Sequence, residues 1–314
     1  MKMRVAIPKD VAVPGKEYLL ERGYEVLVGT GNRDHDYIAS FIHDADAVLA
    51  RTPDYSADVL SAAPRLKVVS RHGAGMDGFD LAYCRAHGIR VTNAPGANAV
   101  SVAEHTIGQL LGLAHCIPMY DRNVRRNCWE KLRDMDCIDL AGRTLGIIGY
   151  GAIGSLVAKK ARAFDMRVLV FSPHLSEELP EGVFPAVSAA EVFASADFIS
   201  LHLPLNERTR EMVDDAMLSR MKEGSYLINN ARGGIISEEA LIRHLQSGHL
   251  AGVALDVFTK EPLPEGHPFL AMENVILTPH TAALTKESKA RMSLMAAMGI
   301  DDVLQGREPR WPVV

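Results

Sequence analysis

The chain has 314 residues, of which 47% are hydrophobic and 23% are charged, and its formal net charge is -5 at pH 7. This composition is typical of a folded globular protein, and the length favours two domains over one. The negative charge gives no overall attraction to nucleic acid or to an anionic membrane, so we expect small-molecule chemistry.

The cysteines and the N-terminus exclude other classes of protein. Four cysteines occur without a CxxC pair or a zinc-like histidine spacing, at positions 84, 116, 128 and 137. We therefore expect reduced thiols, no metal site and no disulfide framework. The first residues, MKMRVAIPKD, contain too short an apolar run for a signal peptide or a membrane helix. We expect a cytoplasmic protein.

Short β-branched runs alternate with amphipathic stretches, which predicts βαβ units and parallel sheets. In the first part of the chain the strands are expected at RVAI (4–7), YEVLV (24–28), DAVLA (46–50), LKVVS (66–70) and IRVT (89–92). The same rhythm returns later and predicts a second sheet. Its strands are expected at TLGIIGY (from 144), RVLVF (167), ADFISL (196), SYLI (225), LAGVAL (250) and NVILTP (274).

Two helical segments separate and follow these sheets. In SVAEHTIGQLLGLAH (101–115), Ser101 and Glu104 have the spacing of a capping box, and the apolar residues have helical spacing. The segment 284–306 is also helical in pattern and is expected to return to the first domain. We predict two doubly wound α/β domains with parallel sheets, in which a Rossmann domain (98–284) is inserted into a flavodoxin-like substrate domain (1–97 and 285–314).

A glycine loop joins the first strand of the second sheet to the next helix. Gly149, Gly151 and Gly154 form G-x-G-x-x-G, with a strand before them and a helix after them. The first glycine permits a tight turn, the second lets a pyrophosphate approach the backbone, and the third lets helix and strand pack closely. A lone glycine motif is a weak signal, but this strand-loop-helix setting predicts dinucleotide binding.

The coenzyme is less well defined. NAD-binding domains place an acidic residue at the end of the next strand, where it binds the ribose hydroxyls. Here RVLVFSPH puts Ser172 at that point, and only His174 and more distant basic residues offer positive charge. Loss of the carboxylate removes repulsion of a 2′-phosphate, which gives a weak lean to NADP. Ser172 is equally consistent with an ordinary small residue at a strand end.

Four ionisable residues follow later strands: Arg232, Asp256, Glu261 and His280. Carboxyl ends of parallel strands share one edge, so these side chains are expected near the dinucleotide. Reduction of a 2-oxo acid needs a cation for the carboxylate and a proton donor for the ketone oxygen. Arg232 suits the first task and His280 the second.

Glu261 and Asp256 have supporting roles in this hypothesis. A carboxylate at Glu261 that is hydrogen-bonded to His280 would favour the imidazolium and orient it. Asp256 is expected to orient the site. Each residue alone also fits a structural role in a turn or a loop. Only their combination downstream of the glycine loop favours catalysis.

The chain resembles the D-isomer-specific 2-hydroxyacid dehydrogenase family, which includes phosphoglycerate dehydrogenase and glyoxylate/hydroxypyruvate reductase. The resemblance covers nearly the whole chain and rests on several motifs in the same order. They are RHGAGMDGFDL (71–81), NAPGANAVSVAEHTIG (93–108), TLGIIGYGAIG (144–154), INNARGGIISEEAL (228–241), LDVFTKEPLP (255–264) and TPHTA (278–282).

The resemblance implies an NAD(P)-dependent dehydrogenase acting on a small D-2-hydroxy or 2-oxo acid. The family's catalytic Arg, Glu and His correspond to Arg232, Glu261 and His280. Substrate contacts are implied for Ala74, Gly75 and Arg232, and also for Arg51, which is equally consistent with a solvated strand-end charge. Cofactor contacts are implied for the glycine loop with Ala152 and Ile153, and for Ser172, Leu203, Pro204, Thr209, Asn230, Ala231 and Asp256. A homodimer through residues 99–139 is implied as well.

Two departures and some rival interpretations qualify this view. Ser172 replaces the family's common Asp, and the chain ends without the C-terminal regulatory domain of many phosphoglycerate dehydrogenases, so serine feedback through such a domain is not expected. Glu261 stands where the related formate dehydrogenases have Gln. The main alternative is a dinucleotide-sensing, corepressor-like binding protein on the same fold; a methyltransferase would leave the Arg, Glu and His unexplained.

A basic cluster in residues 122–133 is interleaved with acidic residues. It comprises Arg122, Arg125, Arg126, Lys131 and Arg133. Because acidic residues alternate with these cations, we interpret the cluster as a solvated or dimer-facing surface rather than a nucleic-acid site.

Overall fold

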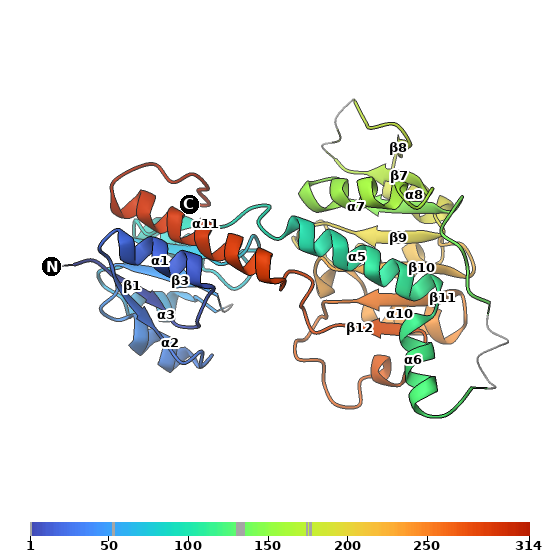
Figure 1. The fold of residues 1–314 in the computed structure, drawn as a ribbon, viewed down its shortest axis with the longest axis horizontal. Coiled ribbons are helices and arrows are strands. Elements are labelled where there is room, and N and C mark those ends of the chain that lie inside the picture. Colours follow the sequence, from blue (N-terminus) through green and yellow to red (C-terminus); the bar gives the residue numbers. More distant parts are fainter. Residues whose placement is uncertain (1, 52–53, 130–135, 174, 176–177) are drawn as a thin grey trace. The chain divides into compact units, whose positions relative to one another are not determined.

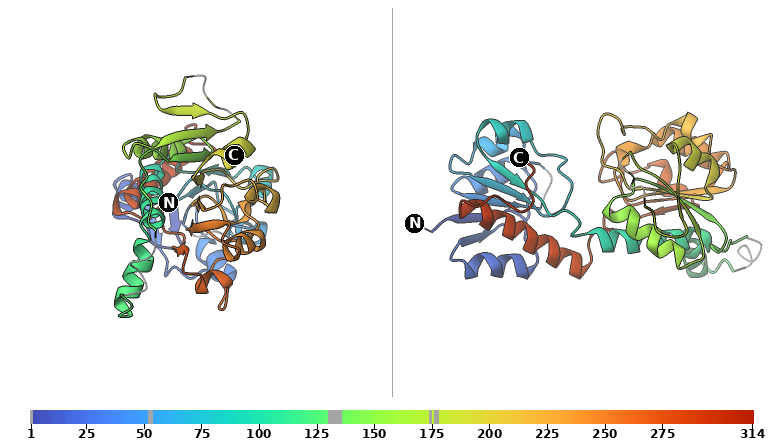
Figure 2. Two further views of the ribbon diagram at one scale, coloured as in Figure 1. Left: turned by 90° about the vertical axis from the view of Figure 1, so that its right-hand side faces the viewer. Right: turned by 90° about the horizontal axis from the view of Figure 1, so that it is seen from above.

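The structure is a computed structural model that describes residues 2–51, 54–129, 136–173, 175 and 178–314 (Figure 1). It divides into two compact units: Met1–Asn98 with Ala283–Val314, and Ala99–Ala282. Among the described residues, no helix is both long and apolar enough to cross a membrane. Figure 2 shows the sheet and the flanking helices of each unit from two further sides.

The first unit is built on a five-stranded parallel sheet with strand order β2-β1-β3-β4-β5. This is the flavodoxin-like order, as predicted. The strands are β1 (Arg4–Ile7), β2 (Glu25–Val28), β3 (Ala47–Ala50), β4 (Val68–Arg71) and β5 (Arg90–Thr92). Side chains alternate between the two faces: Val5 and Ile7 enter one core cluster and Ala6 enters the other.

Helices cover both faces of this sheet. They are α1 (Val13–Glu21), α2 (His35–Ile42), α3 (Ala57–Ser61), α4 (Leu81–Ala86) and α11 (Lys286–Leu304). Helix α11 comes from the C-terminal end of the chain and packs beside α1 (Figure 1). The close crossing uses small residues, since the Gly15 N–H donates to Ser293 Oγ at 3.0 Å. The C-terminal helix thus completes the core of the first unit.

The second unit holds a seven-stranded parallel sheet with strand order β12-β11-β10-β9-β6-β7-β8. Counted from β6, the first six strands follow the Rossmann order with one strand added at the edge, as predicted for this domain. The strands are β6 (Thr144–Ile148), β7 (Arg167–Phe171), β8 (Val183–Pro185), β9 (Phe198–Leu201), β10 (Ser225–Asn229), β11 (Leu250–Leu255) and β12 (Val275–Leu277). The short edge strand β8 was not predicted.

Two sets of helices enclose the second sheet. Helices α5 (Ala99–Ala114) and α7 (Ala152–Arg162) pack on one core cluster. Helices α8 (Ala189–Ser195), α9 (Asp215–Leu218) and α10 (Glu238–Gln246) pack on the other. Helix α6 (Ile117–Arg125) follows α5. In such a sheet, ligands bind where the strand order reverses, which here is between the carboxyl ends of β6 and β9.

The predicted start of α5 was wrong. The helix begins at Ala99, so Ser101 lies inside its first turn and is not the N-cap. Glu104, the supposed partner of Ser101, forms an ion pair with Lys160 at 3.3 Å. Ser101 and Val102 are instead buried inside the first turn of α5, so tertiary packing and not a local cap decides where this helix starts.

Candidate active site

The glycine loop lies at the point where the strand order reverses. Gly149 follows β6 with φ of 97°, a conformation that favours glycine. A Cβ at Gly149 would collide with the backbone carbonyl of His202, which follows β9, and one at Gly154 would collide with the carbonyl of Gly149. Only glycine lets β6, α7 and β9 approach this closely, which explains two of the three motif positions.

The middle glycine of the motif, Gly151, faces open space. Gly151 is the N-cap of α7, and a Cβ there would meet no atom within 4 Å. The space therefore lies at the positive end of an 11-residue helix, whose first N–H groups have no partner within the helix. In addition, Asn230 Oδ1 is buried without a hydrogen-bond partner among the described residues. These residues fit a dinucleotide, with its pyrophosphate at Gly151, Ala152 and Ile153.

Ser172 follows β7 directly beside this loop. The Gly149 N–H donates to the Phe171 carbonyl at 2.8 Å, and Ser172 is partly exposed. Ser172 therefore lies directly after β7, the strand whose end carries the ribose-binding residue in dinucleotide-binding domains of this type. His174, the other residue considered for coenzyme choice, lies outside the described residues.

The loop after β9 carries the predicted contacts Leu203, Pro204 and Thr209. Thr209 Oγ1 donates to the Pro204 carbonyl at 2.7 Å and accepts from the Asn206 N–H at 2.8 Å. These bonds close the loop on itself. Thr209 therefore has a structural role here besides any contact with a ligand.

The turn after β10 holds Arg232. Asn229 fixes this turn, since its Oδ1 accepts from the Ala231 N–H at 3.0 Å and its Nδ2 donates to the Arg232 carbonyl at 2.8 Å. The next residue, Gly233, lies so close to the backbone of Phe258 that a Cβ would collide with it. The Arg232 turn and the loop after β11 are thereby packed together.

Asp256 follows β11 and holds the loop after β12. It is only 1% exposed, and its carboxylate accepts hydrogen bonds from Thr278 Oγ1 at 2.6 Å and from the Thr281 and Ala282 N–H groups at 2.8 Å each. The Asp256 carbonyl also accepts from the His280 N–H at 2.8 Å.

These bonds hold His280 in a costly backbone conformation. Its φ is 53°, and a left-handed conformation costs a non-glycine residue about 1–2 kcal/mol. The hydrogen bonds to Asp256 offset this cost and hold the loop that carries His280.

His280 and Glu261 form a close pair. His280 Nδ1 lies 2.7 Å from Glu261 Oε2, and both side chains are about half exposed. Burial alone would raise the pKa of Glu261, but the hydrogen bond and positive charge of His280, the Phe258 N–H and Arg232 together hold that pKa below its usual range. Because Nδ1 is engaged, His280 Nε2 is the ring nitrogen left for a substrate.

The structure therefore brings four predicted residues to one edge of the second sheet. Arg232, Asp256, Glu261 and His280 follow the neighbouring strands β10, β11 and β12. The predicted substrate contacts Arg51, Ala74 and Gly75 belong to the first unit, where they follow β3 and β4. Arg51 Nη1 donates to the Asp10 carbonyl at 2.5 Å.

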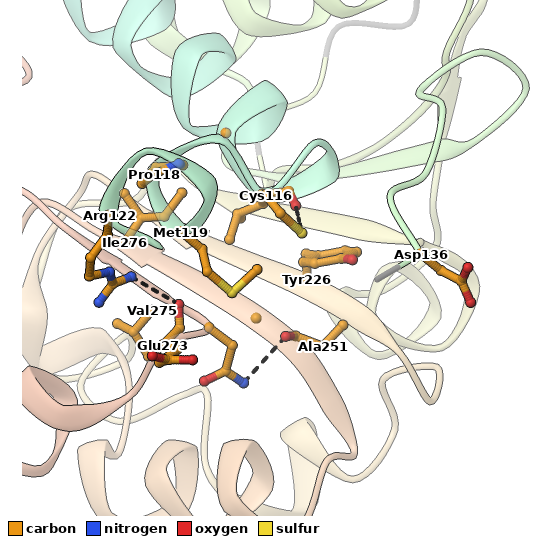
Figure 3. A pocket seen from close by; sticks show the side chains of 14 residues that line it. Cys116, Pro118, Met119, Arg122, Asp136, Tyr226, Ala251, Glu273, Val275 and Ile276 are labelled. Carbon is orange, nitrogen blue, oxygen red and sulfur yellow. Dashed lines mark hydrogen bonds between the residues drawn. The ribbon is translucent and has the colours of Figure 1, made fainter. Parts of the chain in front are cut away.

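A separate pocket of about 200 Å³ lies at the opposite edge of the second sheet (Figure 3). Its lining includes Cys116, Pro118, Met119, Tyr226 and Ile276. None of the predicted catalytic or cofactor residues lines it. The pocket lies at the amino ends of β10 and β11, so it is not the dinucleotide site.

Sequence reasoning missed two polar residues that contact Thr278 next to Asp256. His105 Nε2 lies 3.1 Å from Thr278 Oγ1, and Gln109 Nε2 lies 3.4 Å from the same atom. No local pattern marks His105 or Gln109, because a helical segment shows its spacing but not the distant strand that it faces.

Comparison with known proteins agrees with these features. Residues 107–282 match the family model of the D-isomer specific 2-hydroxyacid dehydrogenase NAD binding domain. The chain is 36% identical over 306 residues to D-3-phosphoglycerate dehydrogenase of Archaeoglobus fulgidus, covering 97% of this chain and 58% of that protein. It thus spans little more than half the length of that relative.

Two further relatives match over most of their length. Glyoxylate reductase of Aeropyrum pernix is 36% identical over 316 residues, covering 98% of this chain and 94% of that protein. The solved structure of NADPH-dependent glyoxylate/hydroxypyruvate reductase from Sinorhizobium meliloti superposes with a TM-score of 0.88 at 28% identity, covering 100% of this chain and 98% of the other.

Proposed function

The chain belongs to the D-isomer-specific 2-hydroxyacid dehydrogenase family, and from this we propose that it interconverts a small D-2-hydroxy acid and its 2-oxo acid using a nicotinamide coenzyme. The observation that carries the proposal is the His280–Glu261 pair at 2.7 Å, at the same sheet edge as the glycine loop. The names of the relatives favour a dehydrogenase or reductase over the corepressor-like alternative.

Each residue has a defined task in this reaction. The bound nicotinamide supplies or accepts the hydride. The Arg232 guanidinium binds the substrate carboxylate in a bidentate pair. In the reducing direction His280 Nε2 donates a proton to the ketone oxygen, and in the oxidising direction it removes the hydroxyl proton. Glu261 stabilises the imidazolium, and Asp256 holds the loop that carries His280.

The two units then divide the work. The second unit, Ala99–Ala282, binds the dinucleotide, and the first unit, Met1–Asn98 with Ala283–Val314, contributes substrate contacts. Ala74 and Gly75 offer backbone N–H groups to a carboxylate, and Arg51 offers a guanidinium.

A panel of 2-oxo acids tests the proposal. We expect consumption of NADPH or NADH, followed by absorbance, with glyoxylate and hydroxypyruvate. If the protein binds a dinucleotide but turns over no 2-oxo acid in either direction, the dehydrogenase assignment is wrong and a dinucleotide-sensing binding protein takes its place.

One observation favours a phosphorylated substrate within that panel. Lys9, Arg33 and Arg51 lie near one another in the first unit, where burial and then the charges of Arg33 and Arg51 lower the pKa of Lys9. Burial and then Arg51 also lower the pKa of His72, to about 4. Clustered cations stabilise a second anionic group, so we expect a lower KM for phosphohydroxypyruvate than for hydroxypyruvate. Equal KM values would remove this cluster from substrate binding.

Replacing Glu261 with Gln should change the pH profile of reduction. The charge of Glu261 favours protonated His280, and by the same linkage His280 lowers the pKa of Glu261. Glutamine has no carboxylate charge to stabilise an imidazolium in the site, so the alkaline limb of kcat/KM for reduction should move to lower pH. An alkaline limb that stays in place would exclude this role for Glu261.

Replacing Ser172 with Asp should change the coenzyme preference. We propose NADP as the preferred coenzyme, because no carboxylate at the end of β7 repels a 2′-phosphate. We expect higher kcat/KM with NADPH than with NADH in the natural protein, and a loss of at least about tenfold with NADPH in the Asp variant. Ser172→Ala is the matched control. A natural preference for NADH would contradict the proposal.

We also propose a homodimer formed through residues 99–139. Three apolar side chains on and after α6 are exposed, namely Ile117 (54%), Val124 (42%) and Trp129 (58%). In the basic cluster of residues 122–133, Arg125 forms an ion pair with Asp121 at 2.9 Å. Lys131 and Arg133 of this cluster lie outside the described residues. We expect twice the chain mass by light scattering, and a monomer after Ile117→Asp. A monomeric natural protein would contradict this assembly.

A further inference from the structure

Helix α5 presents two polar side chains to the loop that carries His280. His105 and Gln109 are four residues apart, so they lie on one face of the helix. His105 Nε2 and Gln109 Nε2 lie 3.1 and 3.4 Å from Thr278 Oγ1. His105 Nε2 is also 3.9 Å from Asp256 Oδ1. Both residues therefore converge on the threonine that contacts the Asp256 carboxylate.

The direction of each hydrogen bond follows from the carboxylate. Ionised Asp256 only accepts, so the Thr278 hydroxyl donates its single proton to Asp256 Oδ1 at 2.6 Å. The lone pairs of Thr278 Oγ1 are then the only groups left for its other partners, and these partners must be donors. His105 must carry its proton on Nε2, and Gln109 must present its NH₂ group.

A second contact confirms the orientation of Gln109. Its Oε1 accepts from Asn230 Nδ2 at 2.8 Å, and Asn230 Nδ2 also donates to Thr106 Oγ1 at 2.9 Å. With the oxygen of Gln109 held by Asn230, its nitrogen points to Thr278. Through the Gln109 amide, helix α5 thus links Asn230, which follows β10, to Thr278 in the loop after β12.

We propose that His105 and Gln109 are positioning residues that act on His280 through Thr278 and Asp256. Two donors on Thr278 Oγ1 hold its hydroxyl toward Asp256, and Asp256 in turn accepts the N–H groups of Thr281 and Ala282. The same Asp256 accepts, through its carbonyl, the N–H of His280. The inference rests on the proposed dehydrogenase function and adds α5 to the groups that orient the proton donor.

Three substitutions at His105 separate positioning from packing. Glutamine places its NH₂ donor at about the position of histidine Nε2. Asparagine has the same donor on a side chain that is too short to reach Thr278, and leucine fills the space without a donor. We expect kcat to fall roughly tenfold in His105→Leu and in His105→Asn, and to stay within about threefold of the natural value in His105→Gln. The Kd for the dinucleotide should stay within about twofold in all three variants.

The controls use the same helix and the same network. Glu104→Gln lies on α5 but pairs with Lys160 instead, so its kcat should be unchanged. Thr278→Val should lower kcat as His105→Leu does, and the double variant should lose no more than the single ones. Equal kcat in the Leu and Gln variants, or losses that multiply in the double variant, would overturn the proposal.

A spectroscopic measurement tests the donor direction without turnover. The ¹⁵N spectrum is recorded for the natural protein with its dinucleotide, and the His105 signals are assigned by their loss in His105→Gln. We expect these signals to show a neutral ring that carries its proton on Nε2. A neutral ring protonated on Nδ1 would overturn the proposal. If the natural protein reduces no 2-oxo acid, the proposed dehydrogenase function is wrong. If the natural protein turns over normally but the three His105 variants have equal kcat, only the positioning role is wrong.

Discussion

Replacing His280 with alanine is expected to lower kcat by about 10²–10⁴, the range of a lost general acid or base. In the proposed reaction the imidazole exchanges a proton with the substrate oxygen through Nε2, because its Nδ1 lies 2.7 Å from Glu261 Oε2. The Kd of the dinucleotide should be nearly unchanged, since the glycine loop follows β6 and does not use His280. Steady-state kinetics with glyoxylate and a fluorescence titration with coenzyme measure both quantities.

His87 provides the matched control for this substitution. It is an exposed histidine in the first unit that stacks on Tyr83, so His87→Ala should leave kcat unchanged. Near-natural turnover in His280→Ala would remove His280 from the reaction and with it the central assignment.

Replacing Arg232 with lysine is expected to lower kcat/KM for the 2-oxo acid on the order of 10²-fold, and alanine should lower it further. Lysine keeps the positive charge but loses the planar fork that binds a carboxylate through two hydrogen bonds. The turn around Arg232 should survive, because it is held by the Asn229 side chain and by the close approach of Gly233 to Phe258.

The control for this variant is Arg220→Lys, an exposed arginine after α9. Its kcat/KM should equal that of the natural protein. If Arg232→Lys also keeps full kcat/KM, the carboxylate is bound by another group. A drop in dinucleotide affinity instead of substrate affinity would move Arg232 to the cofactor side of the site.

Much of the fold could be predicted from the sequence, because strand and helix patterns are local. The runs RVAI and RVLVF match β1 and β7 at both ends, since buried parallel strands are continuous apolar segments. The roles of Gly149 and Gly154 could also be predicted from their motif, because a tight turn and a close helix–strand contact each exclude a Cβ. The short strand β8 and the start of α5 could not, because pairing and packing with distant residues decide them.

The sequence by itself predicted which residues supply the chemistry: Arg232, Glu261 and His280 stand after strands whose carboxyl ends must share an edge. Only the tertiary structure decided how they are held. Three features depend on how β11 and β12 pair: the 2.7 Å contact of His280 with Glu261, the left-handed backbone at His280, and the hydrogen bonds that Asp256 accepts from the loop after β12. His105 enters that arrangement from a helix 173 residues earlier in the chain. A hydrogen bond needs two groups within about 3 Å, and the sequence pattern of a single helix carries no record of its partner.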